Sequence, residues 1–205
     1  MTLHKPQQER HRDILASARR RFIADGYAGA RLNDIAGDAG LSKGGVYFHF
    51  KSKREIFDAL IADDSKRDLE RLEAMKAEEG SAADKLLRFV SEGLRESVTD
   101  PIRAKFRVVM GDMALADPDI RARLKELHDA VVVALRELIV SGAAGGGLRA
   151  DLDAEIAANV VLVAMDGLRV AVAAEFHEPE LLERLVDQGV GRLVLGFVAP
   201  AAVAA

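Results

Sequence analysis

The sequence predicts an all-α protein. Apolar residues recur at the three-to-four-residue spacing of amphipathic helices along most of the 205-residue chain, and no segment alternates convincingly as a strand would. Capping residues or prolines open the helical segments and glycines close several of them. Asp100-Pro101 and Asp117-Pro118 each place a capping side chain before a proline that suits a first helical turn. We expect about nine helices from these signals.

The first half of the chain divides into one long, two short and one long helical segment. Apolar residues from Ile14 to Phe22 keep helical spacing, and Asp25-Gly26 is a good helix end. Two short helical segments follow, separated by residues 39–42. Ser52 with Glu55 three residues later is typical of a capping box and should open a long helix.

The second half continues with long helices. Ser81 can cap the next helix, and the helix after Pro118 should end in the glycine-rich residues 142–147. Asp151 or Asp153 should cap a strongly apolar helix, and a final helix from Pro179 should end near Phe197. The predicted architecture is therefore a small helical head followed by a larger helical body, with a division at residues 1–55 and 56–205.

Charge is divided unequally between these two parts. Residues 1–55 hold 11 Lys and Arg against 6 Asp and Glu, whereas the remainder holds 18 against 27. A basic head on an acidic body is expected if only the head meets a polyanion such as DNA, although chance variation gives the same pattern about as often. The chain has no cysteine, which excludes disulfides and thiolate chemistry.

The segment from Leu32 to Tyr47 has the spacing of a helix-turn-helix. Small Ala36 permits the close approach of two crossed helices, and Gly40 supplies the tight turn between them. Lys43 and Tyr47 should then lie on the outward face of the second helix, where a lysine can reach a phosphate or a guanine edge and a tyrosine a thymine methyl. Glycine at 44 and 45 lowers the stability of a short helix, which favours a need for close approach to DNA.

The N-terminal quarter resembles the TetR/AcrR family of repressors. The resemblance rests on Asp34-Ile35-Ala36, on 39–44 (AGLSKG), on 46–50 (VYFHF) and on Lys51-Ser52-Lys53 in the order and spacing of that family. It implies a DNA-binding head, a ligand-sensing body and a dimer interface made by the last two helices. Two departures matter: Arg31 replaces a customary threonine, and Gly45 replaces a position that often reads bases.

The resemblance and the spacing together give a set of expected DNA contacts. Asn33 matches a position near the start of the first short helix, and Lys53 matches a phosphate-binding lysine. The expected DNA-binding residues are Arg31, Asn33, Ser42, Lys43, Gly44, Gly45, Tyr47, His49 and Lys53. Val46, Phe48 and Phe50 are expected mostly in the core, and Arg19 to Arg21 mostly on a solvated helix face with one arginine touching phosphate.

A regulator of this plan also needs a pocket in its body. Candidate lining residues are Phe89, Phe106, Met110, Met113, His128, Val131 and Asp166. Asp166 and Asn159 lie on one face of an otherwise apolar helix and need polar partners, which are ligand groups, Arg169 or a second subunit. For each of these residues, packing in the core or an interface is the more common alternative.

The sequence therefore predicts a homodimeric, cytoplasmic repressor that binds a palindromic operator in double-stranded DNA and is released by a small, largely apolar effector. Two alternatives stay open: a regulator or activator whose ligand tightens DNA binding, and a helical interaction module whose head does not bind DNA. We find no catalytic constellation, metal-ligand spacing or cofactor motif, so we expect neither an enzyme nor a metal or cofactor. Asp166 and Arg169 interrupt the most apolar segment, and no membrane association is expected.

Overall fold

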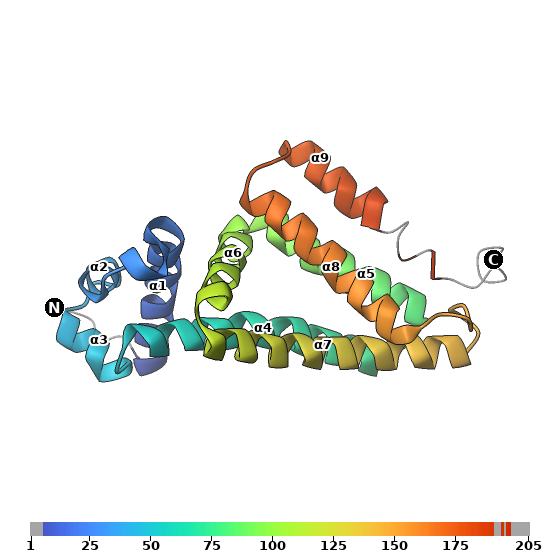
Figure 1. Ribbon diagram of the computed structural model, residues 1–205, viewed down its shortest axis with the longest axis horizontal. Coiled ribbons are helices and arrows are strands. Elements are labelled where there is room, and N and C mark those ends of the chain that lie inside the picture. Colours follow the sequence, from blue (N-terminus) through green and yellow to red (C-terminus); the bar gives the residue numbers. More distant parts are fainter. Residues whose placement is uncertain (1–5, 191–193, 195, 198–205) are drawn as a thin grey trace.

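The computed structural model describes residues 6–190, 194 and 196–197, and in that part of the chain every regular element is a helix (Figure 1). The all-α prediction is confirmed. The elements in order are α1 (Gln7–Gly29), α2 (Leu32–Asp38), α3 (Lys43–His49), α4 (Lys53–Ala77), α5 (Ala82–Thr99), α6 (Pro101–Ala116), α7 (Pro118–Ala144), α8 (Ala154–Ala173), α9 (Pro179–Arg184) and the π-helical segment η1 (Leu185–Val190).

Most of the expected caps form. The hydroxyls of Ser52 and Ser81 each accept a hydrogen bond of 3.1 Å from the main-chain N–H group three residues later, and Ser42, for which no cap was predicted, does the same for α3 at 3.2 Å. Asp117 and Asp153 cap α7 and α8 in the same way. Asp100 is the exception, since its side chain makes no capping bond and α6 begins on its proline alone.

The first helix runs past its expected end. Gly26 adopts a left-handed conformation with φ of +68°, which only glycine adopts without strain, and the chain then completes one more helical turn to Gly29. The last helix differs as well: α9 begins at Pro179 as expected, but it passes into η1 at Leu185. Residues 191–193, 195 and 198–205 lie outside the described part, and Phe197, near which we expect the helix to end, lies in a turn.

A single hydrophobic core joins the head to the start of the body. Phe22 of α1 packs against Phe57 of α4 and Phe106 of α6, with ring centroids 5.3 and 6.5 Å away, and Ile61 of α4 is buried in the same cluster. The predicted division at residues 55 and 56 therefore falls inside α4, which runs unbroken from head to body in Figure 1. That division stays a prediction.

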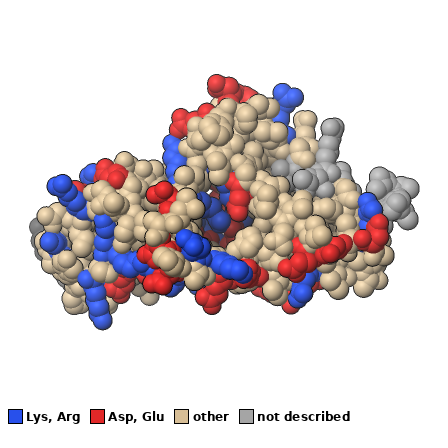
Figure 2. Space-filling view, in the orientation of Figure 1, with Lys and Arg blue, Asp and Glu red and all other residues tan. Residues whose placement is uncertain are grey.

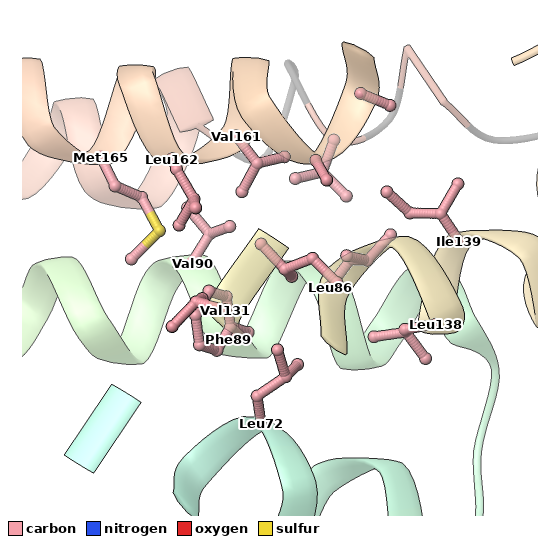
Figure 3. Close-up of a cluster of buried hydrophobic side chains, with 14 of the residues drawn as sticks. Leu72, Leu86, Phe89, Val90, Val131, Leu138, Ile139, Val161, Leu162 and Met165 are labelled. Atoms are coloured by element: carbon pink, nitrogen blue, oxygen red, sulfur yellow. The ribbon is translucent and has the colours of Figure 1, made fainter. Parts of the chain in front are cut away.

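A second core fills the body between α4, α5, α7 and α8. Leu72, Phe89, Leu135 and Val161 are buried there, one from each helix, and Figure 3 shows how the side chains from these helices converge. Gly142 allows α7 to approach the start of α5, because a Cβ at position 142 would lie only 2.4 Å from the Cβ of Ala82. The body is thus a packed helical bundle, and α9 with η1 lies against α5.

Helix α8 is the one helix in the described residues that is long and apolar enough, by length and composition, to cross a membrane. Asp166 and Arg169 do not take the helix out of that class, and the absence of membrane association stays a prediction. Yet Val161 and Met165 face the protein core, and Arg169 is buried in an ion pair with Asp68. A core helix that also presents an outward apolar face passes the same test.

Candidate nucleic-acid interface and ligand cavity

Helices α2 and α3 form the crossed pair that the sequence predicts. Ile35 and Ala36 of α2 and Val46 of α3 are buried where the two helices meet. Gly40 turns the chain between them with φ of +66°, in the left-handed region. The Ser17 hydroxyl of α1 donates a hydrogen bond of 2.8 Å to the Ile35 carbonyl, so the pair is fixed on α1.

The outward face of α3 carries the side chains expected to meet DNA. Lys43 is exposed, and 46% of the Tyr47 surface is accessible. The Lys43 Nζ lies 5.8 Å from the centroid of the Tyr47 ring, so the two side chains occupy one surface. Ser42 is exposed while its hydroxyl accepts from the Gly45 N–H, and His49 is half-buried at the end of the helix.

A hollow of about 320 Å³ lies between the starts of α2 and α3. Four expected contact residues line it: Arg31, Asn33, Lys43 and Lys53. Three of these side chains are cationic, and no carboxylate lines the hollow among the residues that the structure describes. Figure 2 shows Lys and Arg side chains projecting from this end of the molecule. The arrangement suits a phosphate group, whose charge these donors would meet.

Glycine is not required by packing at either position of α3. A Cβ on Gly44 would approach nothing closer than the Ser42 hydroxyl at 3.8 Å, and one on Gly45 would meet Leu41 at 3.5 Å. Both are ordinary van der Waals contacts. Packing inside the protein therefore does not explain the two glycines. This supports the interpretation that α3 lacks side chains at these positions so that it can approach DNA closely.

We expect Gly44→Ala to stabilise the protein by up to about 0.5 kcal/mol, because glycine is a poorer helix former than alanine and Gly44 lies in the first turn of α3. We expect the same substitution to weaken operator binding about tenfold, because the added methyl group holds the helix away from the phosphates. Urea unfolding and fluorescence anisotropy measure the two effects. Gly111→Ala on α6, where a Cβ also meets nothing within 4 Å, is the matched control and should stabilise without weakening DNA binding. Unchanged DNA affinity of Gly44→Ala would contradict the close-approach argument.

Lys53 has internal partners. Its ammonium donates to the carbonyls of Tyr27, Ala28 and Ala30 at 2.6, 3.2 and 2.9 Å and lies 4.6 Å from the Tyr27 ring centroid. Burial lowers the pKa of Lys53 below its usual value. The three N–H donors thus hold the end of α1 and the start of α2 against α4. A phosphate contact by Lys53 stays a prediction, and it would have to share these donors.

We expect Lys53→Met to lower the free energy of unfolding by about 2 kcal/mol, because it leaves partly buried carbonyls without a charged donor. It should also weaken binding to all DNA sequences alike and flatten the salt dependence by about one unit of slope if phosphate is touched. Chemical denaturation and a salt titration of DNA binding separate the two roles. Lys51→Met removes an exposed lysine two residues earlier and should leave the stability unchanged. Equal stabilities of the two variants would refute the role of Lys53 in holding α1.

The expectation that Phe48 lies in the core is wrong. Val46 and Phe50 are buried, whereas 78% of Phe48 is exposed and its ring lies 5.3 Å from that of His49. Val46 and Phe50 are four residues apart and therefore share the buried face of α3. Phe48 lies two positions from each of them and so falls on the opposite face. Phe48 therefore extends the outward face beside Tyr47. Its spacing of two residues from Val46 was the feature of the sequence that indicated its exposure.

The three consecutive arginines of α1 do different things. Arg19 donates to Asp64 at 2.8 Å, and Arg21 makes a two-point hydrogen-bonded pair with Asp38 at 2.7 and 2.9 Å. Arg20 is exposed. Two of the three side chains thus stabilise the head, and Arg20 is the one whose charge faces solvent.

A cavity of about 680 Å³ opens between α4, α6, α7 and α8, and Figure 2 shows its mouth as a hollow in the centre of the molecule. Four of the expected pocket residues line it: Met110, His128, Val131 and Asp166. Three do not: Phe89 and Phe106 are fully buried in the two cores, and Met113 packs against the core of the head. Its volume is in the range of small-molecule sites.

Charged residues form one wall of this cavity, and the sequence pointed only to Asp166 and Arg169 among them. Asp68 accepts hydrogen bonds from Arg107 at 2.6 Å and from Arg169 at 3.2 Å. Burial alone would raise the pKa of Asp68, but Arg169, Arg107 and Arg71 outweigh it and lower that pKa. Arg169 also donates to Asp166 at 3.1 Å, so Asp166 has the arginine as its partner.

Asn159, the other polar residue of that helix, finds its partner locally. Its side-chain amide donates to the Glu155 carbonyl one turn earlier, at 2.9 Å. A second buried carboxylate lies one turn before Asp68 on α4. Asp64 accepts from Arg19 of α1 and Arg103 of α6 at 2.8 and 3.0 Å. Helix α4 is therefore bound by ion pairs both to the cavity wall and to the head.

Two protein-family models match successive parts of the chain. Residues 14–60 match the family model described as "Bacterial regulatory proteins, tetR family", and residues 82–195 match the one described as "BetI-type transcriptional repressor, C-terminal". The second match covers more than half of the chain. The chain belongs to the TetR family of transcriptional regulators.

Similar proteins extend the likeness over the whole length. The HTH-type transcriptional repressor AcnR of Corynebacterium efficiens is 28% identical over 193 residues, which cover 92% of this chain and 95% of that protein. The HTH-type transcriptional regulator TtgR of Pseudomonas putida is 28% identical over 171 residues, covering 78% and 79%. The solved structure of the fatty acid degradation regulator FadR of Bacillus halodurans superposes with a TM-score of 0.80 at 22% identity, covering 94% and 97%, and shows the shared fold.

These comparisons confirm the family and the function class. This TetR-family chain is a DNA-binding transcriptional regulator with a helix-turn-helix head, and its relatives are regulators rather than enzymes. The individual residues of the DNA surface and of the cavity stay predictions, supported by the exposure of α3 and by the lining of the cavity.

Proposed function

We propose that this TetR-family regulator is a cytoplasmic, homodimeric repressor that binds a palindromic operator through α3 and leaves it when a small, largely apolar ligand enters the cavity. The observation that carries the proposal is the presence of both an outward Lys43–Tyr47 surface and a cavity of about 680 Å³ in the same chain. The name of the C. efficiens relative, a transcriptional repressor, supports the sign of regulation.

The outward face of α8 supports dimerisation. Ile156, Val160, Val163 and Val170 are exposed along it, and exposed Gly167 falls between the last two at intervals of four and three residues. Such a stripe pairs well with its own copy about a twofold axis. Helix α9 adds a half-exposed Leu181 next to this region of the chain. Together they are the interface that we propose, made by the last two helices.

The twofold symmetry of a dimer suits the geometry of double-stranded DNA. A seven-residue recognition helix reads few bases, and a dimer places two such helices in successive major grooves about 34–36 Å apart. A palindromic operator then presents each helix with the same half-site. Direct readout would come mainly from Lys43 and Tyr47, since Gly44 and Gly45 carry no side chains, and DNA shape would supply part of the specificity.

Helix α4 is the element that links ligand and operator. Its Asp68 belongs to the cavity wall, its Asp64 holds Arg19 of the head, and its first turn carries Lys53 against the end of α1. A ligand that favours a different position of α4 would move the two heads away from the half-site spacing. A preference of a few kcal/mol between the two arrangements is enough to release the operator.

The test is a gel shift of the purified protein with the DNA upstream of its own gene, together with its mass by light scattering. The proposal expects a dimer, a specific shift in the nanomolar range at physiological salt, and loss of the shift when a cavity ligand is added. A ligand that strengthens the shift would instead favour a ligand-tightened regulator or activator. Absence of any specific shift would favour a helical interaction module whose head does not bind DNA, and would overturn the proposal.

A further inference from the structure

Arg107 on α6 has hydrogen-bonding capacity that the protein does not use. Its Nη2 donates to Asp68 at 2.6 Å. In the described part of the chain no other hydrogen bond engages its Nε or Nη1, and neither atom is sealed from solvent. The side chain is enclosed by neighbouring helices yet keeps 29% of its surface accessible, and it lines the cavity. Because Arg107 lines the cavity and these donors reach solvent, they are available to a ligand bound there.

The carboxylates of the same wall are already neutralised. Asp68 lies within ion-pair distance of three guanidinium groups, those of Arg71, Arg107 and Arg169 at 3.7, 2.6 and 3.2 Å. Asp166 pairs with Arg169 and is half exposed at the edge of the cavity. Burial and the nearby charge of Arg107 lower the pKa of Arg169. Over the whole lining of the cavity, the four cations Arg107, Arg121, Lys125 and Arg169 exceed the three carboxylates Asp68, Asp112 and Asp166 by one, so the lining favours an anion over a cation.

The remaining lining is mostly apolar. It includes Met110, Leu124, Leu127, Val131 and Leu162, contributed by α6, α7 and α8. Methionine and leucine side chains give an adaptable surface for an alkyl or aromatic body. A ligand that satisfies the whole cavity therefore needs one charged end and one apolar end.

We propose that the cavity binds an apolar monocarboxylic acid, with its carboxylate on the N–H groups of Arg107 that do not bond Asp68 and its apolar body against the leucines of α7. A carboxylate is the planar acceptor that matches two parallel N–H groups of a guanidinium. The inference names the ligand class for the cavity of the proposed repressor, and it rests on that proposed function for its regulatory meaning. The binding itself is measurable without DNA.

The experiment is calorimetric titration of the full-length protein with three probes that share a twelve-carbon alkyl chain and differ in head group: dodecanoate, dodecanol and dodecyltrimethylammonium. Each is used below the concentration at which it aggregates. Dodecanoate should bind at least tenfold more tightly than either of the others. In the series from octanoate to dodecanoate, affinity should rise about threefold to fourfold per methylene group until the cavity is filled. Equal binding of the three head groups, or preference for the ammonium, would overturn the proposal.

Substitutions locate the site. Arg107→Gln should weaken dodecanoate about 10-fold to 100-fold and change dodecanol by less than threefold, because only the charged contact is lost. Arg123→Gln, an exposed arginine on α7, is the matched control and should change neither. If Arg107→Gln does not fold, Leu127→Trp narrows the cavity and should shift the preferred acid to a shorter chain. An unchanged chain-length profile in that variant, or unchanged dodecanoate affinity in folded Arg107→Gln, would count against the site.

The two proposals fail separately. A protein that shifts its upstream DNA but does not distinguish dodecanoate from the other probes refutes the carboxylate site and leaves the repressor intact. A protein that binds dodecanoate through Arg107 but shifts no DNA supports the site and overturns the repressor.

Discussion

Replacing Tyr47 with alanine is expected to lower the affinity for the operator about 100-fold without changing the mass or stability of the dimer. Tyr47 is the largest side chain on the outward face of α3 that offers both a hydroxyl and an apolar ring. One good base contact contributes about 1–3 kcal/mol, and twofold symmetry repeats the loss in each half-site. Because nearly half of the side chain is exposed and no hydrogen bond holds it in the described structure, the fold loses little.

Fluorescence anisotropy with operator and with unrelated DNA, at two salt concentrations, measures this effect. Binding to unrelated DNA should change by less than threefold, since the phosphate contacts that we propose for Lys43 and Arg31 would remain. Leu115→Ala, which truncates an exposed apolar side chain on α6, serves as the control and should leave operator binding unchanged. Specific binding that survives Tyr47→Ala would mean that α3 is not the reading helix.

The head was predictable because its signals are local. The Ser52 cap, the small Ala36 at the helix crossing and the left-handed Gly40 each depend on residues a few positions away. Such features follow from backbone geometry and side-chain spacing alone. The same reasoning correctly placed Lys43 on an exposed face of α3.

The cavity wall was not predictable because its contacts join distant parts of the chain. Asp68 and Arg169 are 101 positions apart, and nothing in either local sequence identifies the other as its partner. The same holds for Lys53, whose carbonyl partners lie 23 to 26 positions earlier and depend on how α1 ends. Phe89 and Phe106 were predicted in the pocket but are buried in the two cores. A large apolar residue on a helix suits a core and a pocket equally, so the sequence alone could not distinguish the two.

Placing a charge on the outward face of α8 is expected to have a comparably large effect. Val163 lies near the middle of the apolar stripe and is 68% exposed in the single chain, so Val163→Glu costs the folded protomer little. In the proposed dimer, the twofold axis would bring two glutamates together in an interface that excludes water, and neither would have a cationic partner. Unpaired like charges in such a place cost several kcal/mol, which is enough to make the protein monomeric at micromolar concentration.

The consequence for DNA binding follows from geometry. Two joined heads bind an operator with a high effective concentration of the second head, and separating them removes about 10²-fold to 10⁴-fold in affinity without touching α3. Light scattering and operator titration of Val163→Glu test both steps, with Val133→Glu, an exposed valine on α7, as the control that should stay dimeric. A variant that remains a dimer would place the interface elsewhere, whereas a folded monomer with full operator affinity would show that pairing of the heads does not contribute to recognition.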